Sequence, residues 1–512
     1  MTAIPTVKAL AAALCLASAA PSFALDLLQA YRSALRNDAQ LAAARAQLQV
    51  IRERVPQARA GLLPAVSAGA SLMRQNTDTN LAPVRRFTSQ SYSVSVSYPL
   101  FRLQNVELFE QTKLQVGAGE AQLAQATQDL VLRVSQAYFD LLAAHDNVST
   151  LESQIRAITE QLASAKRNFE VGTATITDQQ EAQARYDLAV AQEIAARNDL
   201  EVKRAALAQL IGQPVGDIDG LRPGVRLNGP EPARESEWAS NARESNFTVL
   251  QQQIAAEIAR REIDRQRYAR YPVVDLVGSV SYGQNSAVNF IGVRSTNAAV
   301  GVQLSVPLYT GGLIDARVRE AAASLDQSSS TLESLRRQAE QSARQAYLGL
   351  SSGLAQVNAL EAAERSSRLA LDSNLLGYQV GVRINIDVLN AQQQLFQTRR
   401  DLARARYDAL LNGLRLQATA GALGEEDVQA VNALLTPIGT SGQEGPSTVG
   451  TPQPPLQMTP MPAPGAAGTP VVPGAPGAPA TVPPLPGAPS SQGIPGASPA
   501  PLPGSSLPGQ RR

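Results

Sequence analysis

The side chains that most often carry out chemistry are scarce in this sequence. The chain of 512 residues contains one histidine, His145, and one cysteine, Cys15. Zinc sites, cysteine–histidine nucleophile pairs and most histidine acid–base schemes need more of these residues than the chain has. We therefore expect no enzymatic activity, no cofactor and no metal site, and we interpret His145 as an ordinary helix residue and 425–427 as a solvated acidic run.

The charge balance argues against one class of partner. The chain has 45 lysine and arginine side chains against 44 aspartate and glutamate side chains, so its formal net charge is +1. Proteins that bind nucleic acid usually carry a basic excess or a basic stripe. We therefore expect no nucleic acid partner.

Two short turns carry the polar residues with the most suggestive spacing. The first turn spans 171–178 and the second spans 380–387, and each has a glycine at its second position, Gly172 or Gly381. Glycine adopts the left-handed conformation that ends a helix. Each segment is therefore predicted to be a tip turn between two helices.

The same turns contain candidate caps for the helices that follow them. Thr177 or Asp178 is predicted to cap the helix after the first turn, with Glu181 completing a capping box, and Asp387 is predicted to cap the helix after the second. A purely mechanical role accounts for all of these residues.

The N-terminal segment 1–24 is predicted to be a signal peptide. A basic residue precedes an apolar run at 9–20, and small residues permit cleavage after Ala24. Cys15 lacks the small neighbour that a lipidation site needs, so we expect a mature chain that starts at Leu25 and contains no cysteine. The alternative, a buried apolar helix, is too short to span a bilayer.

Proline placement separates the body of the chain from its C-terminal part. Prolines are absent from 100–213 and from 308–436, so both blocks can be continuous helix. Residues 437–512 are rich in proline, glycine, alanine and serine, a composition that predicts a disordered tail with polyproline II character. A glycine at every third position is not sustained there, which argues against a collagen helix.

The body contains an internal two-fold repeat. Pro64 and Pro272 are 208 residues apart, and the pair Val171 and Gly172 recurs 209 residues later as Val380 and Gly381. Chance matches would not keep one spacing, so each half is predicted to be one copy of the same unit. The predicted parts are the first copy 25–212, a connecting segment 213–234, the second copy 235–421 and a further connecting segment 422–436.

Each copy contains a stretch that alternates with period two. Residues 91–98 place serines on one face and apolar side chains on the other, and 300–306 repeat this pattern. Each stretch follows a weaker partner, which predicts β-hairpins at 64–100 and 272–308. The connecting loops are expected at about 75–90 and 283–298.

Aromatic residues gather near the ends of these strands. One end is expected to carry Tyr98, Phe101, Tyr271 and Tyr309, and the other Phe87, Tyr92, Tyr282 and Phe290. Strands of about ten residues with aromatic girdles are typical of an outer-membrane barrel, although a water-soluble sandwich is the alternative. A transmembrane barrel needs about eight strands and tolerates no open edge, so several chains must share one barrel.

The remaining segments have helical periodicity. The block 103–170 would form one helix of about 100 Å, whereas 27–60 and 179–212 are each about half as long. The second copy repeats these proportions, with helices expected at 312–379, 235–269 and 388–421. Two short helices can therefore stack end to end beside one long helix.

Both tips resemble those of a known family. Residues 378–391, which begin Tyr-Gln-Val-Gly, and 402–407 resemble the second tip region of TolC-type outer-membrane efflux proteins, and 168–178 resemble the first. Residues 307–312 match the strand-to-helix junction of that family, whereas the first copy lacks the corresponding glycines. The resemblance covers about 25–423.

This resemblance implies a mixed α/β membrane protein: a TolC-like homotrimer whose 12-stranded transmembrane β-barrel, with four strands per chain, continues into a long periplasmic α-helical barrel. It implies an exit duct for efflux or type I secretion in the outer membrane of a Gram-negative bacterium. The implied partners are outer-membrane lipid, a periplasmic adaptor and an inner-membrane pump of the RND or ABC type. The connecting segments would form an equatorial collar, where Trp238 is expected to anchor packing.

The resemblance also implies a gate at the periplasmic tip. The matching positions are Asp178, Tyr378 and Arg383, and an arginine can donate in fork geometry to a carboxylate. Members of the family place rings of acidic side chains at the second tip. Asp387 fits the outer ring, whereas Asn390 leaves the next ring uncharged. An ordinary solvated face is the alternative for Tyr378 and Arg383.

Two other functions fit the sequence less well. A passive porin would place most of its chain in strands and would not need two long proline-free blocks. A trimeric surface fibre or adhesin would explain the helices but not a hairpin and a glycine turn in each copy. The fibre remains the alternative to transport.

Deleting the residues after 437 should leave trimer assembly unchanged, because the tail composition cannot form a packed core. The oligomer band of the truncated protein on a non-denaturing gel checks this. Loss of that band would assign the tail a part in assembly.

Overall fold

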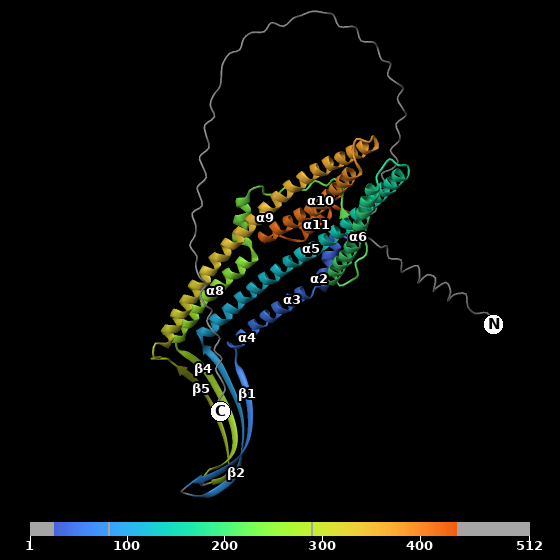
Figure 1. Ribbon diagram of the computed structural model, residues 1–512. Helices are drawn as coiled ribbons and strands as arrows, with labels where there is room; N and C mark the ends of the chain where they lie inside the picture. Colours follow the sequence, from blue (N-terminus) through green and yellow to red (C-terminus); the bar gives the residue numbers. More distant parts are fainter. Residues whose placement is uncertain (1–24, 80–81, 288–289, 438–512) are drawn as a thin grey trace, which may run out of the picture. The chain divides into compact units, whose positions relative to one another are not determined.

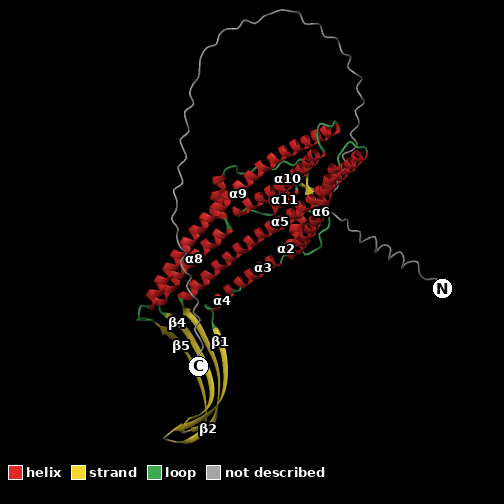
Figure 2. Cartoon of the chain, in the orientation of Figure 1, coloured by secondary structure: helices red, strands yellow, loops and turns green. Residues whose placement is uncertain are grey.

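The computed structural model describes residues 25–79, 82–287 and 290–437. All of them belong to the first of two units, Met1–Glu444, and the second unit is Gly445–Arg512. The predicted signal peptide with Cys15 and the predicted tail beyond Pro437 lie outside the described residues. The described chain is mostly helical with a few strands (Figure 2).

Four long strands form one antiparallel sheet in the order β1-β2-β4-β5 (Figure 1). The first hairpin joins β1 (Ala65–Thr79) to β2 (Ala82–Phe101), and the second joins β4 (Val273–Ala287) to β5 (Phe290–Ser305). Strands β2 and β4 pair across the two hairpins. Within the described residues, β1 and β5 are therefore the open edges of the sheet.

The alternation in sequence becomes two different faces of the sheet. On one face, Val94 lies opposite Ala68 of β1 and Val280 of β4, and these side chains are exposed rather than covered by helices. On the other face, serines of β1 and β2 share hydroxyl hydrogen bonds, with Ser67 and Ser95 2.7 Å apart. One face of the sheet is thus apolar and the other is lined by hydroxyl groups.

The strands are longer than predicted. The segments 75–90 and 283–298 were expected to be loops, but their described residues continue the ladders, with Gln75 opposite Phe87 and Asn285 opposite Val293. Backbone hydrogen bonds hold a hairpin together even where both side-chain faces are polar, so the loss of apolar alternation did not mark the strand ends. The strands have 15 to 20 residues instead of about ten.

Two very long helices follow the hairpins. Helix α5 (Leu103–Glu170) has 68 residues and α9 (Leu313–Gln379) has 67. Helices α3 (Ala39–Arg52) and α6 (Ile176–Ile211) pack on the two halves of α5. The shorter helices α8 (Phe247–Arg267) and α10 (Asn385–Thr419) lie between α5 and α9.

Two helices that were expected to be continuous are interrupted by capping residues. The segment 27–60 divides into α2 (Leu27–Asn37), α3 and α4 (Arg54–Ala60). Asp38 has an extended backbone between α2 and α3, accepts a hydrogen bond from the backbone N–H of Leu41 at 2.7 Å and pairs with Arg133 at 3.1 Å. This cap on α3 and the ion pair with α5 favour the break over a continuous helix.

The segment 235–269 divides in the same way. Helix α7 (Glu235–Ser245) ends before α8, and a 3-10 turn, η1 (Tyr268–Arg270), follows α8. Asn246 accepts from the N–H of Thr248 at 2.9 Å, and its amide donates to the carbonyl of Thr419 at 3.0 Å. Asn246 thus caps α8 and ties it to the end of α10.

The largest buried cluster lies where the short helices meet the middle of α5. Its fully buried members include Leu27, Tyr138, Leu142 and Ile211. A two-stranded sheet, β3 (Asp219–Leu221) with β6 (Leu435–Pro437), and helix α11 (Glu425–Asn432) pack nearby. The two connecting segments of the sequence therefore meet here.

Trp238 belongs to α7 rather than to a connecting segment. It packs with Leu350 and Leu416, and its indole N–H donates to the carbonyl of Pro232 at 2.8 Å. It therefore anchors α7 against α9 and α10.

Among the described helices, none combines the length and the apolar content needed to cross a membrane.

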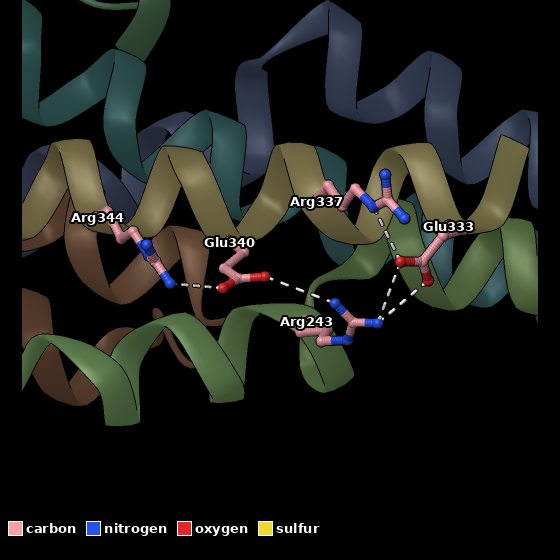
Figure 3. A network of polar contacts seen from close by, with 5 residues as sticks. All are labelled: Arg243, Glu333, Arg337, Glu340 and Arg344. Atoms are coloured by element: carbon pink, nitrogen blue, oxygen red, sulfur yellow. Dashed lines mark hydrogen bonds and ion pairs between the residues drawn. The ribbon is translucent and has the colours of Figure 1, made fainter.

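A network of ion pairs also joins α7 to α9 (Figure 3). Arg243 of α7 lies between Glu333, at 3.1 Å, and Glu340, at 3.5 Å, of α9. Arg337 and Arg344 extend the network along α9. Because these side chains are partly exposed, water and salt screen the pairs and each contributes little to stability.

Replacing Gly421 by alanine should destabilise the protein more than the same change at Gly224. Both glycines have left-handed backbones, with φ of 72° and 73°, so alanine costs about 1–2 kcal/mol at either position. A Cβ at Gly421 would also lie 2.3 Å from the carbonyl oxygen of Ser245, whereas the space at Gly224 is open. Thermal unfolding of the two variants in detergent checks this, and equal losses would contradict it.

Candidate functional site

The two tips share one backbone design. Helix α5 ends at Glu170 and α6 begins at Ile176, while α9 ends at Gln379 and α10 begins at Asn385. Gly172 and Gly381 have φ of 79° and 77°. The N–H groups after both glycines bond back to a carbonyl of the last helical turn, Thr173 to Asn168 at 2.8 Å and Val382 to Gly377 at 2.9 Å. Both turns thus end their helices as the glycines predicted.

The caps differ from those predicted. At the first tip, Thr175 is the N-cap and forms a capping box with Asp178, whose carboxylate accepts from the N–H of Thr175 at 3.0 Å and from its hydroxyl at 2.7 Å. Neither Thr177 nor Asp178 is the N-cap, and Glu181 is not the partner. The helix begins earlier because Thr175 is the residue with an extended backbone.

At the second tip, the prediction that Asp387 caps α10 is wrong. The N-cap position is Ile384, which has no side-chain acceptor, and Asp387 lies in the first turn of the helix. Its carboxylate lies 3.5 Å from the guanidinium of Arg383. A negative charge in the first turn still interacts favourably with the helix dipole.

The three predicted gate residues Asp178, Tyr378 and Arg383 form no hydrogen bond or ion pair with one another within the chain. Asp178 is engaged in its own helix cap. The hydroxyl of Tyr378 accepts from the amide of Asn168 at 3.1 Å, which links α9 to α5. Arg383 pairs with Asp387, and its side chain is 58% exposed. The guanidinium is therefore held by Asp387, itself a predicted tip residue, whereas the phenol is held by Asn168, which the sequence did not indicate.

A buried amide contact joins the two tips. The amide of Gln161 on α5 donates to Oδ1 of Asn385 at 2.5 Å, and the amide of Asn385 donates to the carbonyl of Asp178 at 3.2 Å. Asn385 is 1% exposed. Sequence reasoning missed this contact, although an asparagine between Ile384 and Ile386 was an available signal for a buried polar group.

Asn390 contacts the neighbouring tip helix. Its side-chain oxygen accepts from Arg185 of α6 at 3.2 Å, and the same arginine bonds Gln393 at 2.5 Å. Asn390 also lines an open groove of about 500 Å³ between α9 and α10, together with Asn374, Arg383 and Asp387. The polar side chains of the second tip are therefore grouped around one surface groove.

Apolar side chains stand exposed at the ends of both tips. Val171, Val380, Val382 and Ile384 are each more than 60% exposed. Exposed apolar groups clustered on a surface typically mark a contact with another molecule. Within the described ranges, no group of three or more histidine, cysteine, aspartate or glutamate side chains is arranged to hold a metal ion.

The aromatic residues of the sheet do not all lie at strand ends as predicted. Tyr92 and Tyr282 lie inside the lengthened strands, directly opposite each other, with ring centroids 6.3 Å apart. Phe101 ends β2, and Tyr271 and Tyr309 lie just outside β4 and β5, where Tyr309 is 90% exposed. Tyr98 lies opposite Leu276 near the helical end of the sheet. The side chain of Phe290 is outside the described residues.

Comparison with known proteins agrees with these features. The chain is 32% identical over 417 residues to the outer membrane protein TolC of Vibrio cholerae, covering 81% of this chain and 94% of that protein. It is 31% identical over 421 residues to the alkaline protease secretion protein AprF of Pseudomonas aeruginosa, covering 80% and 88%. These likenesses confirm the resemblance found in the sequence.

The fold has solved counterparts. The outer membrane protein VceC of Vibrio cholerae superimposes with a TM-score of 0.65 at 20% identity, covering 77% of this chain and 96% of that one. A family model described as outer membrane efflux protein matches residues 30–213 and 238–422, which together contain the sheet, the long helices and both tips. The chain therefore belongs to the outer membrane efflux protein family.

Proposed function

We propose that three copies of this chain form one duct that carries solutes or polypeptides out through the outer membrane. The open edges of the sheet are the observation that carries this proposal. Strands β1 and β5 have 15 and 16 residues, and within the described residues each pairs on one side only. If β5 of one chain pairs with β1 of the next, three chains close a barrel of twelve strands, and no edge remains.

The two faces of the sheet support its placement in a membrane. The apolar face carries large exposed side chains, including Val94, Val300 and Val302. Such a face suits contact with outer-membrane lipid, whereas the serine face suits a water-filled lumen. The alternative of a trimeric surface fibre or adhesin gives the apolar face no partner.

The helices extend the same closure below the barrel. Near the tips, α6 packs on α5 and α10 packs between α5 and α9, so α6 and α9 are the outer members of each chain. Both expose apolar side chains, among them Leu188 and Ile194 on α6 and Leu369 on α9. Packing α6 of one chain against α9 of the next would bury them and close a periplasmic tunnel. The matching order of elements in the two halves supports an internal repeat.

The relatives indicate what such a duct serves. One relative is named for secretion of an alkaline protease, and the family is named for efflux. We infer that this chain is the exit duct of a tripartite efflux pump or a type I secretion system. Its partners would be a periplasmic adaptor, received by the exposed apolar side chains of the tips, and an inner-membrane pump of the RND or ABC type. The duct itself performs no chemical step.

The tips would form the gate of this duct. Three-fold symmetry would turn Asp387 into a ring of negative charge and Asn390 into a neutral ring. Arg383, which is exposed and only 3.5 Å from Asp387, can reach a carboxylate or carbonyl of the next chain. Asp178 and Tyr378 would hold the neighbouring turns in place through their caps and hydrogen bonds.

The purified mature protein should be a trimer in detergent, because a single chain leaves two strand edges unpaired in lipid. Native mass spectrometry measures its mass, and a planar bilayer measures the conductance of the inserted particle. A stable monomer that needs no detergent would contradict the proposed duct. It would also contradict the fibre alternative, which requires a trimer.

Replacing Arg383 and Asp387 together by alanine should raise the single-channel conductance and weaken block by divalent cations, because the gate contacts and the acidic ring are removed together. A matched control is the double replacement of Arg404 and Asp408, a pair with the same spacing further along α10, 3.8 Å apart. Conductance that changes equally in both double variants, or in neither, would remove the gate assignment.

A further inference from the structure

The first residue of the predicted mature chain is built into the middle of the fold. Leu25 forms a parallel β-bridge with Ile218, next to strand β3. Its backbone N–H donates to the carbonyl of Asp217 at 2.7 Å, and its carbonyl accepts from the N–H of Asp219 at 3.1 Å. The backbone nitrogen of Leu25 therefore has a fixed position beside β3.

A buried tyrosine fastens this bridge to α5. The hydroxyl of Tyr138 donates to the carbonyl of Leu25 at 3.0 Å and lies 2.8 Å from the carbonyl of Asp219. The ring is fully buried, and burial, followed by the charge of Asp219, raises the pKa of this tyrosine, so its hydroxyl remains a donor. The start of the mature chain is thus part of the largest buried cluster.

Three aspartates are neighbours of the bridge along the chain, and among the described residues none of them forms an ion pair. Asp26 follows Leu25, and Asp217 and Asp219 flank Ile218. Asp26 accepts from the N–H of Gln29 at 2.6 Å and from the amide of Asn432 at 3.3 Å. Within the described part of the chain, no donor reaches the buried Oδ1 atom of Asp219. Burial, and then the charge of Asp26, raise the pKa of Asp219.

Two acidic groups of α11 are engaged elsewhere, and Arg222, which follows β3, donates to the carbonyl of Ala433. On α11, Asp427 accepts from the backbone N–H of Gly424 at 2.9 Å, and Glu425 pairs with Arg32 of α2 at 2.7 Å. The site around Leu25 therefore has an excess of negative charge and one buried oxygen without a donor. A positive group with several hydrogens would satisfy both needs.

We propose that cleavage after Ala24 supplies this group, because it converts the amide nitrogen of Leu25 into an α-ammonium. Hydrolysis of the Ala24–Leu25 peptide bond adds one water, leaving a carboxylate on the released segment and an amine on Leu25 that takes up a proton near pH 7. The backbone amide of Leu25 has one hydrogen, which already bonds to the carbonyl oxygen of Asp217. An ammonium at the same position has three hydrogens. Removal of the signal peptide thus completes the packing of α2, β3 and α5, and export is coupled to the final fold.

This inference rests on the secreted location in the proposed function, but not on transport itself. An ammonium held among carboxylates has a raised pKa, so its stabilising effect is present below the usual pKa of about 7.7–8.0 and is lost as the pH rises through the raised value. The mature protein should therefore lose stability at alkaline pH. Signal-peptide processing would act here as a maturation switch.

The first test measures the amine directly in the purified full-length mature trimer. N-terminal sequencing should give Leu25 as the first residue, and the rate of acetylation of its amine, followed by mass spectrometry against pH, should give a pKa above the usual range. Asp219→Asn should return the pKa toward that range, and so should Asp26→Asn, which keeps the cap on α2 because asparagine is also an N-cap. Asp372→Asn, at an exposed aspartate of α9, is the matched control and should change nothing.

A second test moves the ammonium without removing any contact residue. Inserting one glycine between Ala24 and Leu25 shifts the charge by about 3.5 Å. This variant should lower the unfolding midpoint at pH 7, and Asp219→Asn should then have a smaller effect than in the unextended protein. An amine with an ordinary pKa, a different first residue, or additive effects of the two changes would each overturn the inference. The single-channel conductance of the same preparations tests the duct separately.

Discussion

The structure depends on the need to pair backbone hydrogen-bonding groups at strand edges. Its four-stranded sheet has two long open edges within the described residues, and about half of the N–H and C=O groups on each edge strand point away from the existing partner. In hydrocarbon, each unsatisfied group costs several kcal/mol. In the proposed duct, pairing with the edge strands of neighbouring chains removes this cost. In the same proposal, the long helices that follow the hairpins also need helices of neighbouring chains to close the tunnel wall.

Sequence patterns predicted the elements of this fold better than their ends. The alternation at 91–98 identified β2 and its apolar face, and the absence of proline identified α5 and α9. The strand ends were missed because the ladders continue through polar residues. The helix breaks at Asp38 and Asn246 were missed because no glycine or proline marks either break in the sequence. Both caps are reinforced by distant partners, Arg133 and Thr419, which no local pattern reveals.

At the tips, the sequence predicted the turns but not the residues that cap and connect them. Three threonines alternate in the first turn, Thr173, Thr175 and Thr177, and each is an acceptable cap by residue type. The backbone selects Thr175, and the aspartate then becomes the other half of the capping box. The contact of Gln161 with Asn385 joins residues more than 200 positions apart, so the isoleucines on either side of Asn385 could indicate burial but not the partner. Local chemistry predicted where the turns are, whereas the partners required the tertiary structure.

The hydroxyl-lined face of the sheet has a consequence for whatever moves past it. From Ser91 to Ser97, every position of β2 on that face is serine, and Ser279 and Ser281 of β4 lie opposite. A hydroxyl donates and accepts with equal ease, so such a wall exchanges hydrogen bonds with water and with many polar solutes at similar energies. It offers no deep electrostatic well in which an ion or a peptide would dwell. In the proposed duct, polar solutes would pass this stretch of the wall without binding tightly to it. Selection among transported solutes would then occur in the regions before and after this stretch.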